Sequence, residues 1–299
     1  MKPGASTPAR QDAAFAHITP FAALACPLDG APLQRHAAAW RCAAGHSFDI
    51  ASQGYVNLLP VQNKRSRDPG DSKEMIAARR RFLEAGVYQP IAQAVTEATL
   101  AGLSPESTAG CLDAGCGEGY YLRQLATAAK GRGQALALLG LDISKWAVLA
   151  AAKQDSHTRW VVGSNANLPV LPGTLDRVLC MFGFPVYPEF ARVLRPGGLL
   201  IQVDAGPDHL RELREIIYPS LKPERPASPA APAGFRALPA AETVRYTLAL
   251  SSPEQIADLL VMTPHLYRAS AEGRARAAAL SALTLTVDVR LTRFARNAT

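Results

Sequence analysis

From residue 91 onward, short apolar runs alternate with segments whose apolar residues recur at helical spacing. Strand-like runs occupy 111–115, 135–141, the start of 160–169, 175–182 and 199–204, and helix-like segments occupy 91–102, 120–130 and 189–198. Such alternation predicts a parallel, doubly wound α/β sheet whose ligands bind at the carboxyl ends of its strands. Further on, residues 243–250 are strand-like, residues 253–261 are helical and residues 283–291 alternate with period two, which predicts an antiparallel hairpin at the sheet edge.

The chain before this sheet divides by composition into three parts. Residues 1–22, rich in Ala, Pro, Ser and Thr, are predicted to be a mobile tail. Residues 23–60 form a small module of short hairpin turns, and residues 61–90 form a basic linker and a helix. The main domain then spans residues 91–299, and within it the Pro- and Ala-rich stretch 219–240 is predicted to be an exposed flap.

The helix of the basic linker is predicted to begin at Asp71. An aspartate followed by Glu74 at the third helical position forms a capping-box-like start. Arg79 projects into the middle of the apolar face of this helix. Either its stem packs there while the guanidinium reaches water, or the guanidinium is held for a buried acid or an RNA phosphate.

Composition adds a compartment and a class of partner. No apolar run approaches the ~20 uncharged residues of a membrane span, and no signal-peptide core is present, so we expect a cytoplasmic protein with no membrane partner. Five cysteines scattered over 299 residues fit a reducing compartment. Of the formal net charge of +7, residues 64–81 carry seven Lys/Arg against three Asp/Glu. This cluster is either a solvated face or a surface for an anionic partner.

The most informative stretch runs from Cys111 to Tyr121, where a short apolar run is followed by glycines at positions 115, 117 and 119 and by a helix start. Glycines let the backbone turn sharply and approach a ligand. A dinucleotide fingerprint would need its third glycine at position 120, where Tyr120 stands. Asp142 follows Gly119 by 23 residues, at the end of the next predicted strand, where a carboxylate can reach ribose hydroxyl groups. The pattern predicts a cofactor site, and the alternative is an ordinary glycine-rich turn between a strand and a helix.

Cysteine and histidine in the small module suggest a metal site. Cys26, Cys42 and His46 have the spacing of a zinc ribbon that lacks one ligand, and Asp29 occupies the vacant place. An aspartate can bind Zn²⁺ through oxygen, although it is the less usual choice beside two thiolates. The alternative is that both cysteines are small buried apolar residues in a module that needs no metal.

Two of these stretches resemble known families. The glycine loop resembles motif I of the methyltransferases that use S-adenosylmethionine (SAM). The resemblance implies a Rossmann-like, seven-stranded class I sheet with SAM as cofactor. Asp113 would support the loop, Gly115, Gly117 and Gly119 would admit the methionine end of SAM, and Glu118 lies between them. Many methyltransferases bind adenine near the loop 163–169, where Asn165, Asn167 and Leu168 offer side-chain or backbone amides.

The run from His46 through Asp71 resembles the N-terminal signature of the RlmA-type (RrmA) 23S rRNA guanine-N1 methyltransferases, and the similarity extends from about Cys26 to the C-terminus. This resemblance implies a methyl acceptor in 23S rRNA and an N-terminal module that engages RNA. The sequence leaves open whether the protein forms a homodimer. It implies zinc ligands at Cys26, Asp29, Cys42 and His46, with Asp29 standing where cysteine is usual. It also implies that Tyr88 and His209 contact SAM.

Three functions remain open from the sequence. The first is methylation of guanine N1 in a hairpin loop of 23S rRNA; the second is methylation of a small molecule; the third is an RNA-binding assembly factor without methylation. Residues 183–186 follow a predicted strand and should line the target side of the pocket. Asp204 is a candidate base for guanine N1, although the resembling family has no acid there.

Overall fold

The computed structural model describes residues 17–60, 66, 68–220, 231–239, 241–263 and 265–298. Its strands are β1 (Ile18–Pro20), β2 (Gln34–His36), β3 (Ala39–Arg41), β4 (Ser47–Asp49), β5 (Val56–Asn57), β6 (Ala109–Ala114), β7 (Leu136–Asp142), β8 (Arg159–Val162), β9 (Leu175–Met181), β10 (Leu194–Ala205), β11 (Phe235–Ala237), β12 (Glu242–Leu250) and β13 (Leu283–Arg296). Its helices are α1 (Lys73–Glu84), α2 (Gln89–Leu100), α3 (Tyr120–Gly131), α4 (Lys145–Gln154), α5 (Tyr187–Val193), α6 (Arg211–Ile217), α7 (Pro253–Met262), α8 (His265–Arg268) and α9 (Ala271–Ala278).

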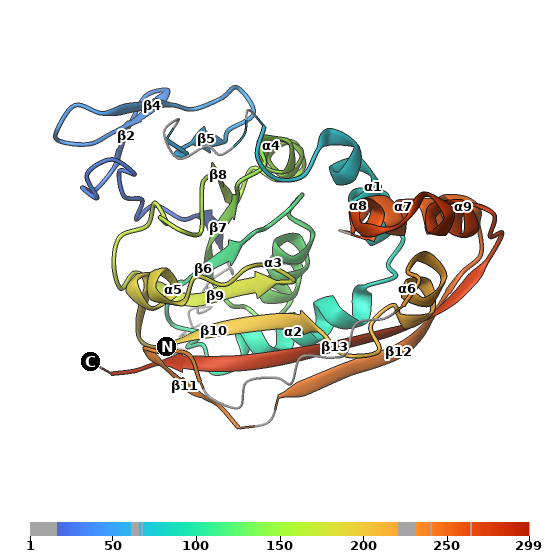
Figure 1. Ribbon diagram of the computed structural model, residues 1–299. Helices are drawn as coiled ribbons and strands as arrows, with labels where there is room; N and C mark the ends of the chain where they lie inside the picture. The colour runs from blue at the N-terminus through green and yellow to red at the C-terminus, as the bar shows by residue number, and fades with distance from the viewer. Residues whose placement is uncertain are drawn as a thin grey trace, which may run out of the picture.

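A ten-stranded sheet forms the centre of the molecule (Figure 1). Seven of its strands, in the order β8-β7-β6-β9-β10-β13-β12, make up the predicted doubly wound sheet. The first five are parallel, and β13 runs antiparallel to both β10 and β12. Every residue of β6 and β9 is buried, as expected for central parallel strands covered on both faces. The fold class predicted from the sequence is therefore confirmed.

Two clusters of buried apolar residues lie on the two faces of this sheet. One cluster joins α2, α3, α4 and α6 to the sheet, and the other joins α5 and the N-terminal module to it. Helix α1 packs against α7 and α4, so the group of α1, α7, α8 and α9 lies together at one side (Figure 1). No helix among the described residues is both long and apolar enough to cross a membrane.

The N-terminal module is a small antiparallel sheet, β2-β3-β4, at one end of the molecule (Figure 1). It is fused to the large sheet, because β5 pairs in parallel with β8 and Leu24 bridges to Val170. Cys26 and Trp40 belong to the same buried cluster as the strands β7 and β9. The module is thus held rigidly against the loop that follows β8.

Two boundaries of the predicted N-terminal parts differ in the structure. Residues 18–20, placed by sequence in a mobile tail, form β1 and pair with β7, because the start of β7 leaves a free backbone edge that Ile18 can cover. Residues 1–16 of that predicted tail lie outside the described residues. Helix α1 begins at Lys73 and not at Asp71, because the Ser72 hydroxyl accepts the hydrogen bond from the Met75 amide (3.3 Å) and so takes the cap position.

Two predicted elements near the C-terminal half also change. The helix expected from residue 189, with Pro-Gly-Gly at 196–198 as its stop, ends earlier, at Val193. The Pro-Gly-Gly segment lies in β10, where the register against β9 shifts between Leu194 and Leu199. Within the expected flap 219–240, Phe235–Ala237 forms β11 against β13, because the Phe235 ring packs edge-on to Tyr187 and Phe294. Residues 221–230 and 240 lie outside the described residues.

Candidate functional site

The four predicted metal ligands converge in the N-terminal module. Ligand atoms of Cys26, Asp29, Cys42 and His46 all lie within 4.8 Å of one another. His46 Nδ1 is 3.5 Å from Cys26 Sγ, 3.3 Å from Cys42 Sγ and 3.1 Å from Asp29 Oδ2. Tetrahedral Zn²⁺ with ordinary bond lengths needs ligand–ligand separations from roughly 3.3 Å for two N or O ligands to roughly 3.8 Å for two S ligands. The donor set and its spacing therefore fit a zinc ion.

Burial and a backbone amide act in opposite directions on the acidic groups of this cluster. Burial raises the pKa of the Cys26 thiol to about 11 in the absence of a cation. The Ala31 amide, which donates to Asp29 Oδ1 at 2.9 Å, is the main cause that lowers the pKa of Asp29 to about 2. A bound metal would replace the thiol protons, since zinc binds the thiolate form.

The glycine loop between β6 and α3 wraps around the end of β7. The amides of Gly115 and Cys116 both donate to Leu141 O, at 2.8 and 2.9 Å, and the Gly117 amide donates to Asp142 Oδ2 at 2.9 Å. Gly115 has a φ of +102°, and a Cβ at this position would meet no atom within 4 Å. Gly119 has a φ of +84°, but a Cβ there would lie 2.5 Å from Trp160. Gly115 thus leaves open space above the sheet, whereas Gly119 permits close packing beneath the loop.

Asp113 is the least satisfied polar group of the described site. Its side chain is fully buried at the carboxyl end of β6, and neither of its oxygens has a hydrogen-bond partner in the described structure. Burial, followed by the charge of Asp142, raises the pKa of Asp113 to about 7. A buried carboxyl group without a donor is costly. Such a group indicates a ligand that supplies the missing donor.

Asp142 ends β7 and braces the loop. Its Oδ1 accepts from the Ser144 amide at 2.8 Å, while its Oδ2 holds the Gly117 amide. Burial raises the pKa of Asp142, and the two amide donors and Arg79 oppose that shift. Each carboxylate oxygen can still accept a second hydrogen bond, so ribose hydroxyl groups remain possible partners.

Arg79 from α1 covers this loop. A Cβ at Gly117 would lie 3.4 Å from its Nη1. The guanidinium pairs with Asp71 at 2.5 Å and donates to Met262 O at 3.0 Å. Arg79 is thus held by an acid, but this acid is half-buried and not the buried one considered from the sequence. It ties α1 and α7 together above the glycine loop.

Tyr88 and His209, far apart in the sequence, contact each other, and both contact Phe182. The ring centroids of Tyr88 and His209 are 6.3 Å apart, and those of Phe182 and His209 are 5.7 Å apart with the rings stacked. Tyr88 also contacts Phe82 of α1 edge-on at 5.3 Å. Three aromatic rings therefore form one wall at the carboxyl ends of β9 and β10.

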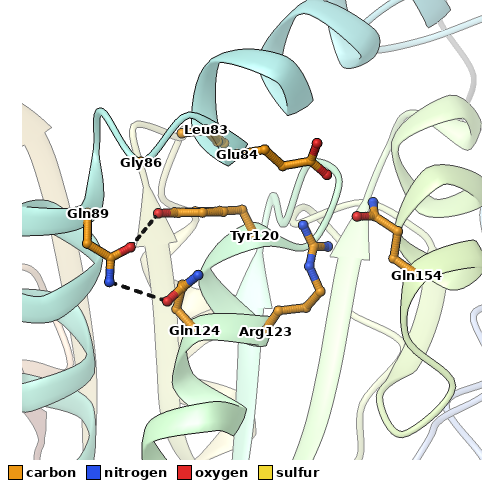
Figure 2. A pocket seen from close by; sticks show the side chains of 8 residues that line it. All are labelled: Leu83, Glu84, Gly86, Gln89, Tyr120, Arg123, Gln124 and Gln154. Atoms are coloured by element: carbon orange, nitrogen blue, oxygen red, sulfur yellow. Dashed lines mark hydrogen bonds between the residues drawn. The ribbon is translucent and has the colours of Figure 1, made fainter.

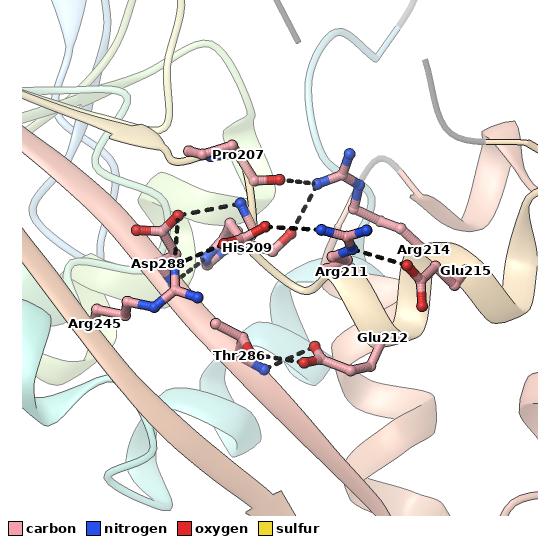
Figure 3. Close-up of polar contacts among 10 residues, drawn as sticks. Pro207, His209, Arg211, Glu212, Arg214, Glu215, Arg245, Thr286 and Asp288 are labelled. Carbon is pink, nitrogen blue, oxygen red and sulfur yellow. Dashed lines mark hydrogen bonds and ion pairs between the residues drawn. The ribbon is translucent and has the colours of Figure 1, made fainter. Parts of the chain in front are cut away.

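Hydrogen bonds with the backbone fix the position and the tautomer of the His209 ring (Figure 3). Its Nδ1 accepts from the Asp288 amide at 3.3 Å, and Asp288 Oδ2 accepts from the Asp208 amide at 3.1 Å. Arg214 donates to the carbonyl oxygens of Pro207 and His209. Burial is the main cause that lowers the pKa of His209 to about 4, so the imidazole is neutral near pH 7. Because Nδ1 accepts, the proton resides on Nε2 and can be donated to a ligand.

The loop after β8 joins the cofactor side to the metal cluster. The Asn167 side-chain amide donates to Pro27 O at 3.1 Å, between the ligands Cys26 and Asp29. The Leu168 amide donates to Glu189 Oε2 at 2.7 Å, and the Leu168 side chain is buried. Asn165 instead donates to Ala114 O at 3.4 Å and keeps a buried Oδ1 without a partner. A role for Asn167 and Leu168 in cofactor binding stays a prediction.

Glu118 faces away from the open side of the loop. Its Oε2 accepts from Arg123 Nη2 at 2.7 Å and from Gln154 Nε2 at 3.0 Å, and its Oε1 is buried without a partner. Arg123 and Gln154 line a cavity of about 240 Å³ beneath the end of α1 (Figure 2). Figure 2 shows Tyr120 crossing this cavity, with its hydroxyl donating to Gln89 at 2.9 Å. A role for Glu118 in cofactor binding likewise stays a prediction.

Two segments of this chain match models of known protein families. Residues 24–67 match the family model for the N-terminal zinc ribbon of RlmA, and residues 111–198 match a methyltransferase domain. A protein of Micromonospora griseorubida named as a candidate 23S rRNA (guanine-N1)-methyltransferase is 37% identical over 91% of this chain and 96% of its own length. The chain belongs to this family. A 23S rRNA (guanine(748)-N(1))-methyltransferase of Streptomyces fradiae is 35% identical over 65% of this chain and 67% of its own length. The candidate of the same name from Bacillus subtilis, YxjB, is 32% identical over 82% of this chain and 86% of its own length.

The site of this methyltransferase fits SAM. Its family and its fold are those of SAM-dependent enzymes. The buried oxygens of Asp113 lack a donor, and the ammonium and hydroxyl groups of SAM are donors. The open space at Gly115 would allow SAM to lie close to the backbone of the loop. Asp113 and Asp142 are thus the residues of this methyltransferase that would hold the polar groups of the cofactor.

Sequence reasoning missed Phe182 and the full role of Arg79. Phe182 has a φ of +52° and contacts both aromatic residues that the family resemblance selected. Its position directly after a buried strand was the available signal. The contacts of Arg79 with the loop depend on how α1 folds back over the sheet, and no local pattern carries that information.

Proposed function

We propose that this protein transfers the methyl group of SAM to N1 of a guanine in a hairpin loop of 23S rRNA. Its relatives carry that name, and the similarity to the Micromonospora griseorubida protein spans the ribbon and the methyltransferase domain together. This joint similarity is the observation that carries the proposal. It argues against a small-molecule substrate, which would not need the ribbon. A cytoplasmic location agrees with such a substrate, and the homodimer stays a prediction.

The arrangement of the ribbon supports an extended substrate. The ligand turn of the ribbon contacts the loop after β8 through Pro27 and Asn167, so a nucleic acid on the ribbon would pass the carboxyl edge of the sheet. The bound SAM supplies an activated methyl group on a sulfonium, and the protein aligns the acceptor and excludes water. The aromatic wall of Tyr88, Phe182 and His209 lies at the carboxyl ends of β9 and β10, the edge at which ligands of such sheets bind.

Guanine N1 carries a proton near neutral pH, so a base or a polarising contact is required. Asp204, the candidate from the sequence, accepts from Gln202 Nε2 at 2.7 Å. Its role as a base stays a prediction, and full turnover by an Asp204→Asn variant would remove it. N1 lies on the Watson–Crick edge, which a duplex hides, so the acceptor must be an unpaired or extruded base.

Transfer of labelled methyl from SAM to unmodified 23S rRNA tests this function. Nuclease digestion and nucleoside mass spectrometry should place the label in 1-methylguanosine. The same rRNA, recovered and returned to a second reaction, should take up no further label, which controls for scattered methylation. Label in another nucleoside would contradict the proposed atom. No label, with SAM binding demonstrated, would contradict the rRNA substrate.

A further inference from the structure

The loop that follows β9 exposes two phenylalanine rings. Among the described residues, the large hydrophobic side chains that are exposed are Leu28, Phe182 and Phe184, with Phe184 at 87%. Single exposed apolar residues are common on protein surfaces. Here, however, two aromatic rings lie two residues apart at the carboxyl edge of a parallel sheet, where ligands of such folds bind.

The backbone of this loop is shaped to present the rings. Phe182 adopts a φ of +52°, a conformation that residues with a side chain rarely take, and its amide donates to Val203 O at 2.8 Å. This turn lays one face of the Phe182 ring on His209 and leaves the residue 40% exposed. Strained residues of this kind concentrate at functional sites. The strain therefore needs an explanation other than packing.

Phe184 is held outward from the same turn. Pro185 follows it and restricts Phe184 to extended backbone conformations, so the residue cannot join a helical turn that folds back. Ring contacts are recorded for Phe182, with Tyr88 and His209, but none for Phe184 among the described residues. A flat apolar surface thus stands in solvent just beyond the aromatic wall.

We propose that Phe184 is a stacking platform for an unpaired base of the RNA substrate. The inference rests on the proposed function and assigns a residue to it. Bases that leave a stack are held on aromatic side chains, and an acceptor at guanine N1 must leave its pair. A ring two residues from the wall that flanks the cofactor is placed to receive such a base at the entrance of the site. Phe182 is then a positioning residue, because its left-handed backbone conformation sets the direction of the loop that carries Phe184.

Three substitutions at position 184 separate stacking from general apolar contact. Stacking on one aromatic ring corresponds to roughly a 5- to 150-fold change in affinity. We expect Phe184→Ala and Phe184→Leu to raise the Kd for unmodified 23S rRNA and the KM for rRNA within that range. The flat ring of Phe184→Trp should keep both near the wild-type values. SAM affinity and thermal stability should not change in any variant, because the side chain is exposed.

Fluorescence gives a second readout, which would not respond to rRNA if residue 184 had only a structural role. The emission of Phe184→Trp minus that of the wild-type protein comes from the new indole at position 184. Addition of rRNA should quench this emission. Wild-type rRNA affinity in Phe184→Leu, or an indole that rRNA does not quench, would overturn the inference. Loss of a dimer without loss of rRNA affinity would also overturn it, by assigning the ring to contact between two copies. Failure of the proposed function is a distinct outcome, because wild-type protein would then form no 1-methylguanosine.

Discussion

Replacing Asp113 by asparagine should stabilise the protein without cofactor at neutral pH. Burial and the charge of Asp142 raise the pKa of Asp113 from 3.8 to about 7. A carboxyl group whose pKa is raised on folding contributes its full stability below the unfolded pKa, and this contribution is lost as pH rises through about 7. The rise, at 1.36 kcal/mol per pH unit, corresponds to roughly 4 kcal/mol. Asparagine carries no charge and does not suffer this loss.

The measurement is urea unfolding of wild type and Asp113→Asn between pH 4 and pH 8. The two proteins should have similar free energies of unfolding near pH 4, where the aspartate is neutral. The variant should be the more stable by up to about 4 kcal/mol at pH 8. The variant should bind SAM more weakly than wild type. A hydrogen bond to a charged group contributes about 1.5–3 kcal/mol, so its loss should raise the Kd for SAM roughly 10- to 150-fold.

Asp176→Asn is the matched control. Asp176 is also buried, but it pairs with Arg195 at 2.6 Å and accepts from the Gly110 amide at 2.7 Å. Removing its charge should destabilise the protein and leave SAM affinity unchanged, because these contacts lie at the opposite end of β6. Equal stability of wild type and Asp113→Asn across the whole pH range would refute the reasoning. So would unchanged SAM affinity in that variant.

Two further predictions test the glycine loop and the metal cluster. Gly119→Ala should lose about 2–6 kcal/mol of unfolding free energy, since strain at φ +84° adds to the clash with Trp160. Gly115→Ala should lose only about 1–3 kcal/mol of unfolding free energy from strain, but most of its SAM affinity. Thermal unfolding measures the loss of stability in each variant, and calorimetry measures SAM binding. A larger loss of stability in Gly115→Ala, with a larger loss of SAM affinity in Gly119→Ala, would contradict the assignment. Asp29→Cys should bind zinc more tightly than wild type in competition with a chromophoric chelator, because a third thiolate replaces a weaker oxygen ligand, while Asp49→Cys, also in the module, should not. Equal zinc affinity of Asp29→Cys and wild type would exclude Asp29 from the metal site.

Local patterns in the sequence were sufficient for the sheet and for the cofactor loop. The alternation of apolar runs and helical segments predicted the parallel order, because β6 and β9 must be apolar on both faces to be buried. Asp142 could be selected because it ends a strand, whereas Asp113 was selected through the resemblance to motif I; parallel strands bring the two residues to one edge of the sheet. The cysteines and His46 of the ribbon were found by spacing, and the structure brings them together with Asp29.

Features that depend on tertiary contacts could not be predicted in this way. Ser72 takes the cap position of α1, and Asp71, predicted to be the cap, pairs instead with Arg79, a contact that depends on how α1 packs. β11 forms because Phe235 packs on β13 and α5, although its neighbours are rich in proline and alanine. The left-handed Phe182 has no local signature, since no glycine or asparagine occupies the position.

The fusion of the ribbon to the sheet gives the two parts a common function. The turn that carries Cys26 and Asp29 holds Pro27, which accepts from Asn167 of the loop after β8, and the Ala25 amide donates to Pro169 O in the same loop. Asn165 of that loop contacts the end of β6 and retains a buried unpaired oxygen beside the cofactor strand. Two direct hydrogen bonds therefore connect the turn of the metal ligands to the loop after β8, for which cofactor binding is predicted. Because binding free energies couple reciprocally, cofactor on that loop would in turn favour the ordered ribbon, and with it the surface offered to RNA.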